Sequence, residues 1–205
     1  MRILKLIVTV AAFVGFLVWA NPTLRAETTQ IPDRIMGNIN APITVLEYVS
    51  MTCSHCAEFY KDTLPELKKR YVETGKVRFI LRDFPLDGVA LKASTIARCM
   101  PEEQFYPFIS VLYGNMAQWI SSTDPDKTLI QYAKLGGLSE EKAKTCLNDT
   151  KLIDAIVAER TDGTKKYDIQ ATPTFIINDG AEKIMGGRKI EDFAAVFDRM
   201  LAAKH

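Results

Sequence analysis

Apolar and polar positions divide the chain into an apolar leader and a globular part whose first strong pattern starts at Ile43. Residues 43–49 form an apolar run rich in β-formers, which predicts a buried strand. Apolar positions at helical spacing over 54–71 predict a helix, which Pro65 should kink and Gly75 should end. Alternation over 77–82 predicts a second strand, parallel to the first through a right-handed crossover.

Helical spacing dominates the next part of the chain. A Ser at 139 is a plausible helix cap, and the Gly136-Gly137 pair is a plausible stop. Two short apolar runs around Asn178-Asp179-Gly180 predict a hairpin over 174–185. The Pro-, Gly- and Asn-rich residues 27–42 predict an arm with little structure. The helices expected after the second strand cover residues 86–99, 102–119, 125–135, 139–148, 150–167 and 190–203.

Residues 1–26 have the pattern of an export signal. Arg2 and Lys5 precede an uncharged run over 6–20, and small-residue cleavage sites follow at Ala20 and Ala26. The run is shorter than the roughly 20 residues that a membrane span needs. We therefore expect a signal peptide over 1–26 and a periplasmic protein, with an uncleaved membrane anchor as the alternative. Disulfides are permitted in that oxidising compartment.

Composition and charge exclude one class of partner. With 47% hydrophobic and 25% charged residues, the 205-residue chain resembles an ordinary globular protein. Beyond the leader, 23 basic residues face 25 acidic ones, a formal charge of −2. Without a basic footprint, nucleic acid is not expected as a partner.

A Cys-x-x-Cys pair opens the first predicted helix just after a buried strand. Helical spacing places the sulfur atoms of Cys53 and Cys56 on one face, close enough to bond. Cys53 lies at the helix N-terminus, where unpaired N–H groups and the helix dipole stabilise a thiolate, so it should attack and Cys56 should resolve. A structural disulfide or half of a zinc site are the alternatives. Zinc favours four ligands, and the chain offers two histidines, one of them the terminal His205, and no second close Cys pair.

Several separate motifs in this order resemble DsbA-like periplasmic thiol–disulfide oxidoreductases over residues 33–203. The resemblance implies an α/β thioredoxin-like fold interrupted by an inserted helical domain. Its first part should cover 27–86, the insertion 87–168 and the second part 169–205. The motifs that resemble the family are Gly37 to Tyr48, Cys53-Ser54-His55-Cys56, Arg82-Asp83-Phe84-Pro85-Leu86, Ala97-Arg98-Cys99 and Ala171-Thr172-Pro173-Thr174-Phe175.

This resemblance also implies an activity. The protein should be a dithiol oxidase that donates its Cys53–Cys56 disulfide to unfolded exported proteins with reduced cysteines. A membrane quinone-linked partner should reoxidise it, and no cofactor or metal is expected. The alternatives are a disulfide isomerase or reductase of the same fold, and a metal carrier that uses Cys53, His55 and Cys56.

Two further residues are candidates for catalysis beside the cysteines. His55 is either an exposed loop residue or a partly protonated imidazole that stabilises the Cys53 thiolate. Glu47 is either a charge at a strand edge or a buried carboxylate with a raised pKa that accepts the proton of Cys56. The family has a glutamate at the matching position, which favours the second interpretation.

Thr172 and Pro173 are the expected substrate-binding residues. The resemblance implies a cis bond between them, which leaves the Thr172 backbone free to pair with an extended substrate. Family oxidases often have valine before this proline and proline in place of Ser54, and both departures favour the isomerase. However, fewer than 25 residues separate the cleavage site from Ile43, too few for the oligomerisation domain of dedicated isomerases. We therefore expect a monomeric oxidase.

Two further cysteines and three apolar residues complete the candidates. Cys99 and Cys146 fall in the predicted insertion, where we expect a structural disulfide; a regulatory role is the minor alternative. Phe84, Met116 and Trp119 are candidates for a substrate surface but are more typical of core residues.

Overall fold

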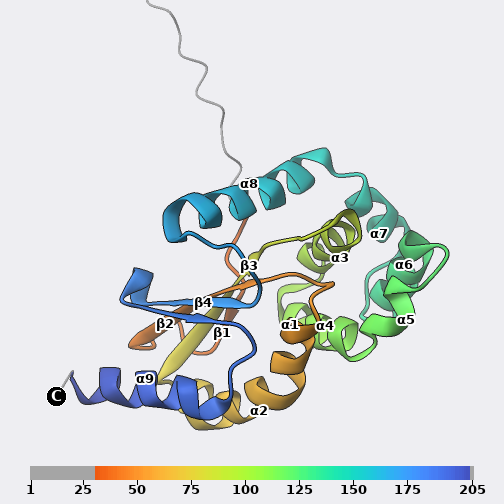
Figure 1. The fold of residues 1–205 in the computed structure, drawn as a ribbon. Coiled ribbons are helices and arrows are strands. Elements are labelled where there is room, and N and C mark those ends of the chain that lie inside the picture. The colour runs from red at the N-terminus through yellow and green to blue at the C-terminus, as the bar shows by residue number, and fades with distance from the viewer. Residues whose placement is uncertain (1–30, 204–205) are drawn as a thin grey trace, which may run out of the picture.

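The computed structural model describes residues 31–203, so the expected signal peptide over 1–26 lies outside the described residues. The sheet within this range has five strands in the order β1-β3-β2-β4-β5 (Figure 1). β2 is central, runs parallel to β3 and antiparallel to β4, and confirms the two predicted strands and their crossover. The strands are β1 Ile35–Met36, β2 Ile43–Val49, β3 Val77–Asp83, β4 Thr174–Ile177 and β5 Glu182–Met185.

The arm before β2 contributes a strand, so the prediction of little structure over 27–42 is wrong at this point. Ile35 and Met36 pair antiparallel with Ile80 and Phe79 of β3. The unpaired backbone groups at the β3 edge supply these hydrogen bonds, a tertiary effect that local composition does not encode. Gly37 follows with φ 110°, where an added Cβ would lie 2.9 Å from the Val77 carbonyl oxygen.

The first crossover helix changes its hydrogen-bond pattern around Pro65, where a kink was predicted. The Leu64 N–H donates to the Phe59 carbonyl five residues back, a π-helical turn. Pro65 has no N–H to offer the carbonyl four residues before it, so the pattern shifts there. The segments in order are α1 Ser54–Glu58, η1 Phe59–Thr63, α2 Leu64–Leu67 and η2 Lys68–Val72.

Helices cover both faces of the sheet. α2 and α9 (Ile190–Ala202) lie on one face, and α8 (Thr150–Tyr167) lies on the other (Figure 1). The rings of Phe59, Phe175 and Phe193 meet on the first face, with centroids 4.6–5.6 Å apart. On the second face, Tyr48 packs edge-on against Tyr167. Among residues 31–203 no helix is both long and apolar enough to cross a bilayer.

The remaining helices, α3 to α7, lie beside one end of the sheet (Figure 1) and, together with α8, fall within the insertion predicted over 87–168. The single helix expected over 102–119 is two helices, because the backbone leaves the helical region at Asn115 and its side chain donates to the Val111 carbonyl. Ser139 caps its helix by accepting from the Lys142 N–H, as predicted. The helices are α3 Gly88–Arg98, α4 Glu102–Gly114, α5 Met116–Ile120, α6 Pro125–Leu135 and α7 Glu140–Leu147.

Buried ionic contacts fix this insertion to the sheet. Arg98 of α3 donates to Asp83 at the end of β3 over 2.5 Å, and both side chains are at most 2% exposed. The same guanidinium reaches the Leu81 carbonyl and Glu159 of α8. Separately, a disulfide between Cys99 and Cys146 joins the end of α3 to α7.

The three apolar candidates for a substrate surface belong largely to the core. Phe84 is 2% exposed and Trp119 is fully buried. Met116 is partly buried and packs against the main core. The interpretation of these residues as core is therefore the correct one for Phe84 and Trp119.

Gly163 of α8 provides a test of this packing. An added Cβ would lie 2.4 Å from the Tyr48 ring, whereas nothing lies within 4 Å of a Cβ at Gly114 of α4. We expect Gly163→Ala to lower the free energy of unfolding by about 1 kcal/mol through overpacking, against the helical preference for alanine. Gly114→Ala should raise it by a few tenths of a kcal/mol or more. Denaturant unfolding of both variants measures the difference; equal stabilisation by both would contradict the contact.

Candidate active site

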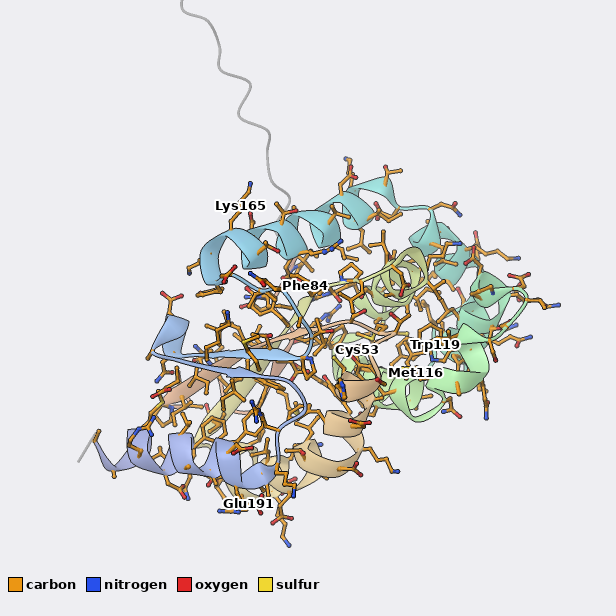
Figure 2. The ribbon with its side chains drawn as sticks, in the orientation of Figure 1. Cys53, Phe84, Met116, Trp119, Lys165 and Glu191 are labelled. Atoms are coloured by element: carbon orange, nitrogen blue, oxygen red, sulfur yellow. A yellow bond between two sulfur atoms is a disulfide. The ribbon has the colours of Figure 1, made fainter. Side chains whose placement is uncertain are left out.

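Cys53 is the residue immediately before α1. Its backbone is extended (φ −86°, ψ 118°), and its N–H donates to the Ser50 carbonyl over 3.1 Å. The side chain lies where the strands meet the inserted helices (Figure 2) and the residue is 9% exposed. Cys53 and Cys56 are both free thiols, so the site is in its reduced form.

Hydrogen-bond donors around the Cys53 sulfur favour its thiolate. The pKa of Cys53 falls to about 5, first because the Cys56 thiol donates to it. The Thr172 side chain and the backbone N–H groups of Cys56 and His55 add to this, while partial burial opposes it. The helix N-terminus contributes as predicted, but the largest contribution is a side-chain contact inside the motif.

Cys56 has the opposite environment. It is fully buried, and burial, followed by the neighbouring Cys53, raises its pKa well above the usual value. At neutral pH the pair therefore consists of a Cys53 thiolate and a neutral Cys56 thiol. This difference in pKa agrees with the expectation that Cys53, at the helix N-terminus, attacks and that Cys56, one turn later, resolves.

The imidazole of His55 points to the surface. Its Nδ1 lies 2.9 Å from Glu58 Oε2, and the side chain is 66% exposed. The hydrogen bond to Glu58 is the main reason that the pKa of His55 is raised, and the charge of Cys53 is the last contribution. The expected close support of the thiolate by this ring is not what the structure shows; the backbone N–H of His55 supplies the contact.

Glu47 is buried in the middle of the central strand, flanked by Leu81 of β3 and Phe175 of β4. The Tyr60 hydroxyl donates to its Oε1 over 2.5 Å, and among the described residues Oε2 has no hydrogen-bond partner. Burial raises the pKa of Glu47 to about 8, so this carboxyl is mostly protonated at pH 7. The strand-edge interpretation is excluded by its position.

The peptide bond between Thr172 and Pro173 is cis, and this loop faces the cysteines. The Cys53 thiol donates to the Thr172 carbonyl over 3.2 Å. The Thr172 hydroxyl is buried and has no partner within hydrogen-bond geometry among the described residues. The Cys53 sulfur, whose pKa this side chain lowers, is the group to which it can donate. Gly186 holds the loop from behind, because its N–H donates to the Pro173 carbonyl over 2.8 Å.

Sequence analysis missed two tyrosines at this site. Tyr60 donates to Glu47, and Tyr113 of α4 donates to the Ser50 carbonyl over 3.1 Å. Both occupy apolar positions of helices, where an aromatic residue ordinarily indicates core, so their hydroxyl groups gave no signal. Within residues 31–203 no group of three or more His, Cys, Asp or Glu side chains is arranged to hold a metal ion.

A family profile described as thioredoxin matches residues 29–199. The chain belongs to the thioredoxin family. Its structure superimposes on that of alpha-DsbA1 from Wolbachia pipientis with a TM-score of 0.77 and 32% identity, covering 83% of this chain and 92% of that one. BdbD from Bacillus subtilis, at 22% identity and a TM-score of 0.74, shows the same fold over 83% of this chain and 93% of its own. The predicted thioredoxin-like fold with a helical insertion is thus confirmed.

Curated relatives of this thioredoxin-family protein have names from disulfide chemistry. A protein-disulfide oxidoreductase described from Rickettsia bellii is 33% identical over 147 residues, 71% of this chain and 57% of its own length. Disulfide bond formation protein D of Bacillus subtilis is 26% identical over 71% of this chain and 67% of its own. The chain spans 54–66% of the length of the rickettsial relatives that it matches. In sequence and in fold the chain is similar to DsbA-like proteins.

Removal of the Thr172 hydroxyl tests its effect on Cys53. In Thr172→Val we expect the pKa of Cys53 to rise from about 5 toward the usual range of a thiol, because one of the groups that lower it is lost. Thiolate ultraviolet absorbance against pH measures this. Thr63→Val is the matched control: Thr63 is equally buried, and its hydroxyl donates to the Arg188 carbonyl instead. An unchanged Cys53 pKa in Thr172→Val would contradict the assignment.

Glu47 should make stability depend on pH in a defined window. Its pKa is raised from 4.5 to about 8 on folding. Between these values the native state binds a proton that the unfolded state has lost, so stability falls as pH rises. The group alone gives a slope of about 1.4 kcal/mol per pH unit in mid-window.

In Glu47→Gln this contribution disappears, so the variant should gain stability over wild type progressively from pH 4.5 to about 8. Denaturant unfolding at several pH values measures the difference. Glu66→Gln, at an exposed position on α2, is the control and should follow wild type. Parallel profiles for Glu47→Gln and wild type would show that Glu47 ionises normally.

Proposed function

We propose that this protein is a thiol–disulfide oxidoreductase, and more narrowly a dithiol oxidase that donates its Cys53–Cys56 disulfide to exported proteins. The observation that supports this most is the pKa of about 5 for Cys53 beside a neutral, buried Cys56. A stabilised thiolate favours the reduced form of the pair, and this makes the disulfide a strong oxidant. The free-energy difference between the disulfide and the reduced pair drives the oxidation of a substrate dithiol.

Each proposed step assigns the electrons to a named atom. A substrate thiolate attacks Sγ of Cys53; the Cys53–Cys56 bond breaks, and its electron pair goes to Cys56. Glu47, protonated at pH 7, supplies the proton that the buried Cys56 thiolate needs. The second substrate thiolate then attacks the substrate sulfur of the mixed disulfide, and Cys53 leaves as a stable thiolate. The substrate loses two electrons, and the cysteine pair gains them.

Groups around Cys53 are suited to an extended substrate. The Thr172 carbonyl oxygen lies 3.2 Å from the Cys53 sulfur. When that sulfur has no proton, as a thiolate or in a mixed disulfide, the carbonyl is free to accept from a substrate N–H. Leu86 is exposed, and its N–H donates to the hydroxyl of Ser50, three residues before Cys53. Exposed Met185 precedes the Gly186 that binds the proline loop. These features favour reduced, unfolded polypeptides as substrates.

The other parts of the proposal concern the setting of the reaction. We infer a periplasmic monomer, reoxidised by a membrane quinone-linked partner, with Cys99–Cys146 as a structural disulfide. Isomerase remains the second candidate, because Thr172 precedes Pro173 and Ser54 follows Cys53. The metal-carrier alternative has little support, since the exposed His55 ring is paired with Glu58 and does not form a ligand group with the two sulfurs.

Two reactions distinguish oxidase from isomerase. The oxidised protein should convert a peptide with two reduced cysteines to its disulfide rapidly, and it should recover little activity from a scrambled multi-disulfide substrate. Cys53→Ser should abolish peptide oxidation. Cys56→Ser, given the same peptide in its disulfide form, should accumulate a mixed disulfide through the Cys53 sulfur, with the second peptide thiol released, seen by mass spectrometry. Efficient recovery of the scrambled substrate by a protein that sediments as a stable oligomer would overturn the oxidase in favour of the isomerase.

A further inference from the structure

Tyr113 connects the inserted helices to the redox turn. It is 5% exposed on α4, and its hydroxyl donates to the carbonyl of Ser50, the residue after β2. The same carbonyl accepts from the Cys53 N–H. The phenol therefore ends on the backbone atom that also holds the start of the Cys-x-x-Cys segment.

The hydroxyl of Tyr113 lies close to the Cys56 thiol, where α4 packs against α1. Cys56 and Glu47 are both fully buried. The Tyr113 ring lies on the Tyr60 ring, with centroids 4.7 Å apart, and Tyr60 in turn donates to Glu47. Burial first, and then the charges of Cys56 and Glu47, raise the pKa of Tyr113 well above its usual value. Tyr113 thus stays protonated and acts as a donor.

Opening of the disulfide puts a negative charge on the buried Cys56 sulfur. When an external thiolate attacks Cys53, the electron pair of the broken S–S bond goes to Cys56. A thiolate in a dry site is costly unless a hydrogen bond stabilises it. The Ser50 backbone and the Thr172 side chain lower the pKa of Cys56 only in part against its burial, and the Tyr113 hydroxyl is a further donor beside the same sulfur. A phenol can rotate about its C–O bond and exchange a carbonyl acceptor for a sulfur acceptor without moving its ring.

We propose that Tyr113 is a catalytic residue for opening of the disulfide: its hydroxyl, which donates to the Ser50 carbonyl at rest, turns to donate a hydrogen bond to the Cys56 sulfur while that sulfur is a leaving thiolate. The tyrosine keeps its own proton, and Glu47 supplies the one that finally neutralises Cys56. This inference deepens the proposed oxidase function and rests on it. It gives the helical insertion a direct part in the chemistry of the pair.

Two reactions of the same Cys53 sulfur separate this role from a structural one. In the opening of the oxidised pair by dithiothreitol, Cys56 leaves as a thiolate. In alkylation of the reduced protein by iodoacetamide, Cys56 remains a thiol throughout. We expect Tyr113→Phe to slow the first reaction about tenfold, since a hydrogen bond to a charged group is lost. The alkylation rate should stay within about twofold of wild type, because no charge develops on Cys56.

Tyr71→Phe is the matched control, because it removes a hydroxyl that donates to Asp198 over 2.9 Å, away from the cysteines. Both of its rates should equal those of wild type. Equal loss of both rates in Tyr113→Phe, or no loss in either, would overturn the proposal. Failure of the wild-type disulfide to oxidise any dithiol would instead reject the oxidase function itself.

A second replacement covers the case in which Tyr113→Phe folds poorly. A ring-fluorinated tyrosine at 113 keeps the hydroxyl and makes it a stronger donor, because fluorine acidifies the phenol. Opening by dithiothreitol should then be faster than in wild type, at an unchanged rate of alkylation. A slower or unchanged opening rate would count against Tyr113 as the donor.

Discussion

The negative charge of Cys53 is stable because segments far apart in the sequence meet at one sulfur. The helix N-terminus brings backbone N–H groups, Cys56 brings its thiol, and the proline loop brings Thr172. The central strand β2 sets this geometry, since it ends at Val49, just before the redox turn, and is flanked by β3 and β4. Each donor lowers the free energy of the thiolate and hence of the reduced protein. The reduction potential of the pair is therefore a property of the whole fold.

The helical insertion is held to this fold by an ion pair buried between Arg98 and Asp83 and extended to the partly buried Glu159. Arg98 of α3 reaches Asp83 at the end of β3 and Glu159 of α8. A buried pair of this kind need not add stability, but loss of one partner leaves the other uncompensated. Such contacts therefore constrain where α3 and α8 can lie. In turn they fix α4, whose Tyr113 reaches the redox turn.

Proton handling at the pair depends on burial more than on charge. Cys56 and Glu47 are both fully buried, and in each the desolvated charged form is disfavoured. In the proposed reaction the Cys56 sulfur becomes a thiolate in this environment. The Glu47 carboxyl, which holds a proton at neutral pH, lies on β2, the strand before the redox turn. The exposed His55, by contrast, is solvated and paired with Glu58. The solvated His55 therefore takes little part in moving the proton of the buried Cys56.

The sequence by itself determined the elements and the reactive pair. Hydrophobic periodicity placed β2, β3, the hairpin and most helices, and the Cys-x-x-Cys spacing at a strand–helix junction identified Cys53, because both are local properties of the backbone. Only the tertiary structure decided that residues 35–36 add an edge strand, that Glu47 is central and neutral, and that His55 faces solvent. Burial, pKa and side-chain partners are set by neighbours distant in sequence. For the same reason the hydroxyl of Tyr113 could not be distinguished from a core aromatic ring until α4 was packed against α1.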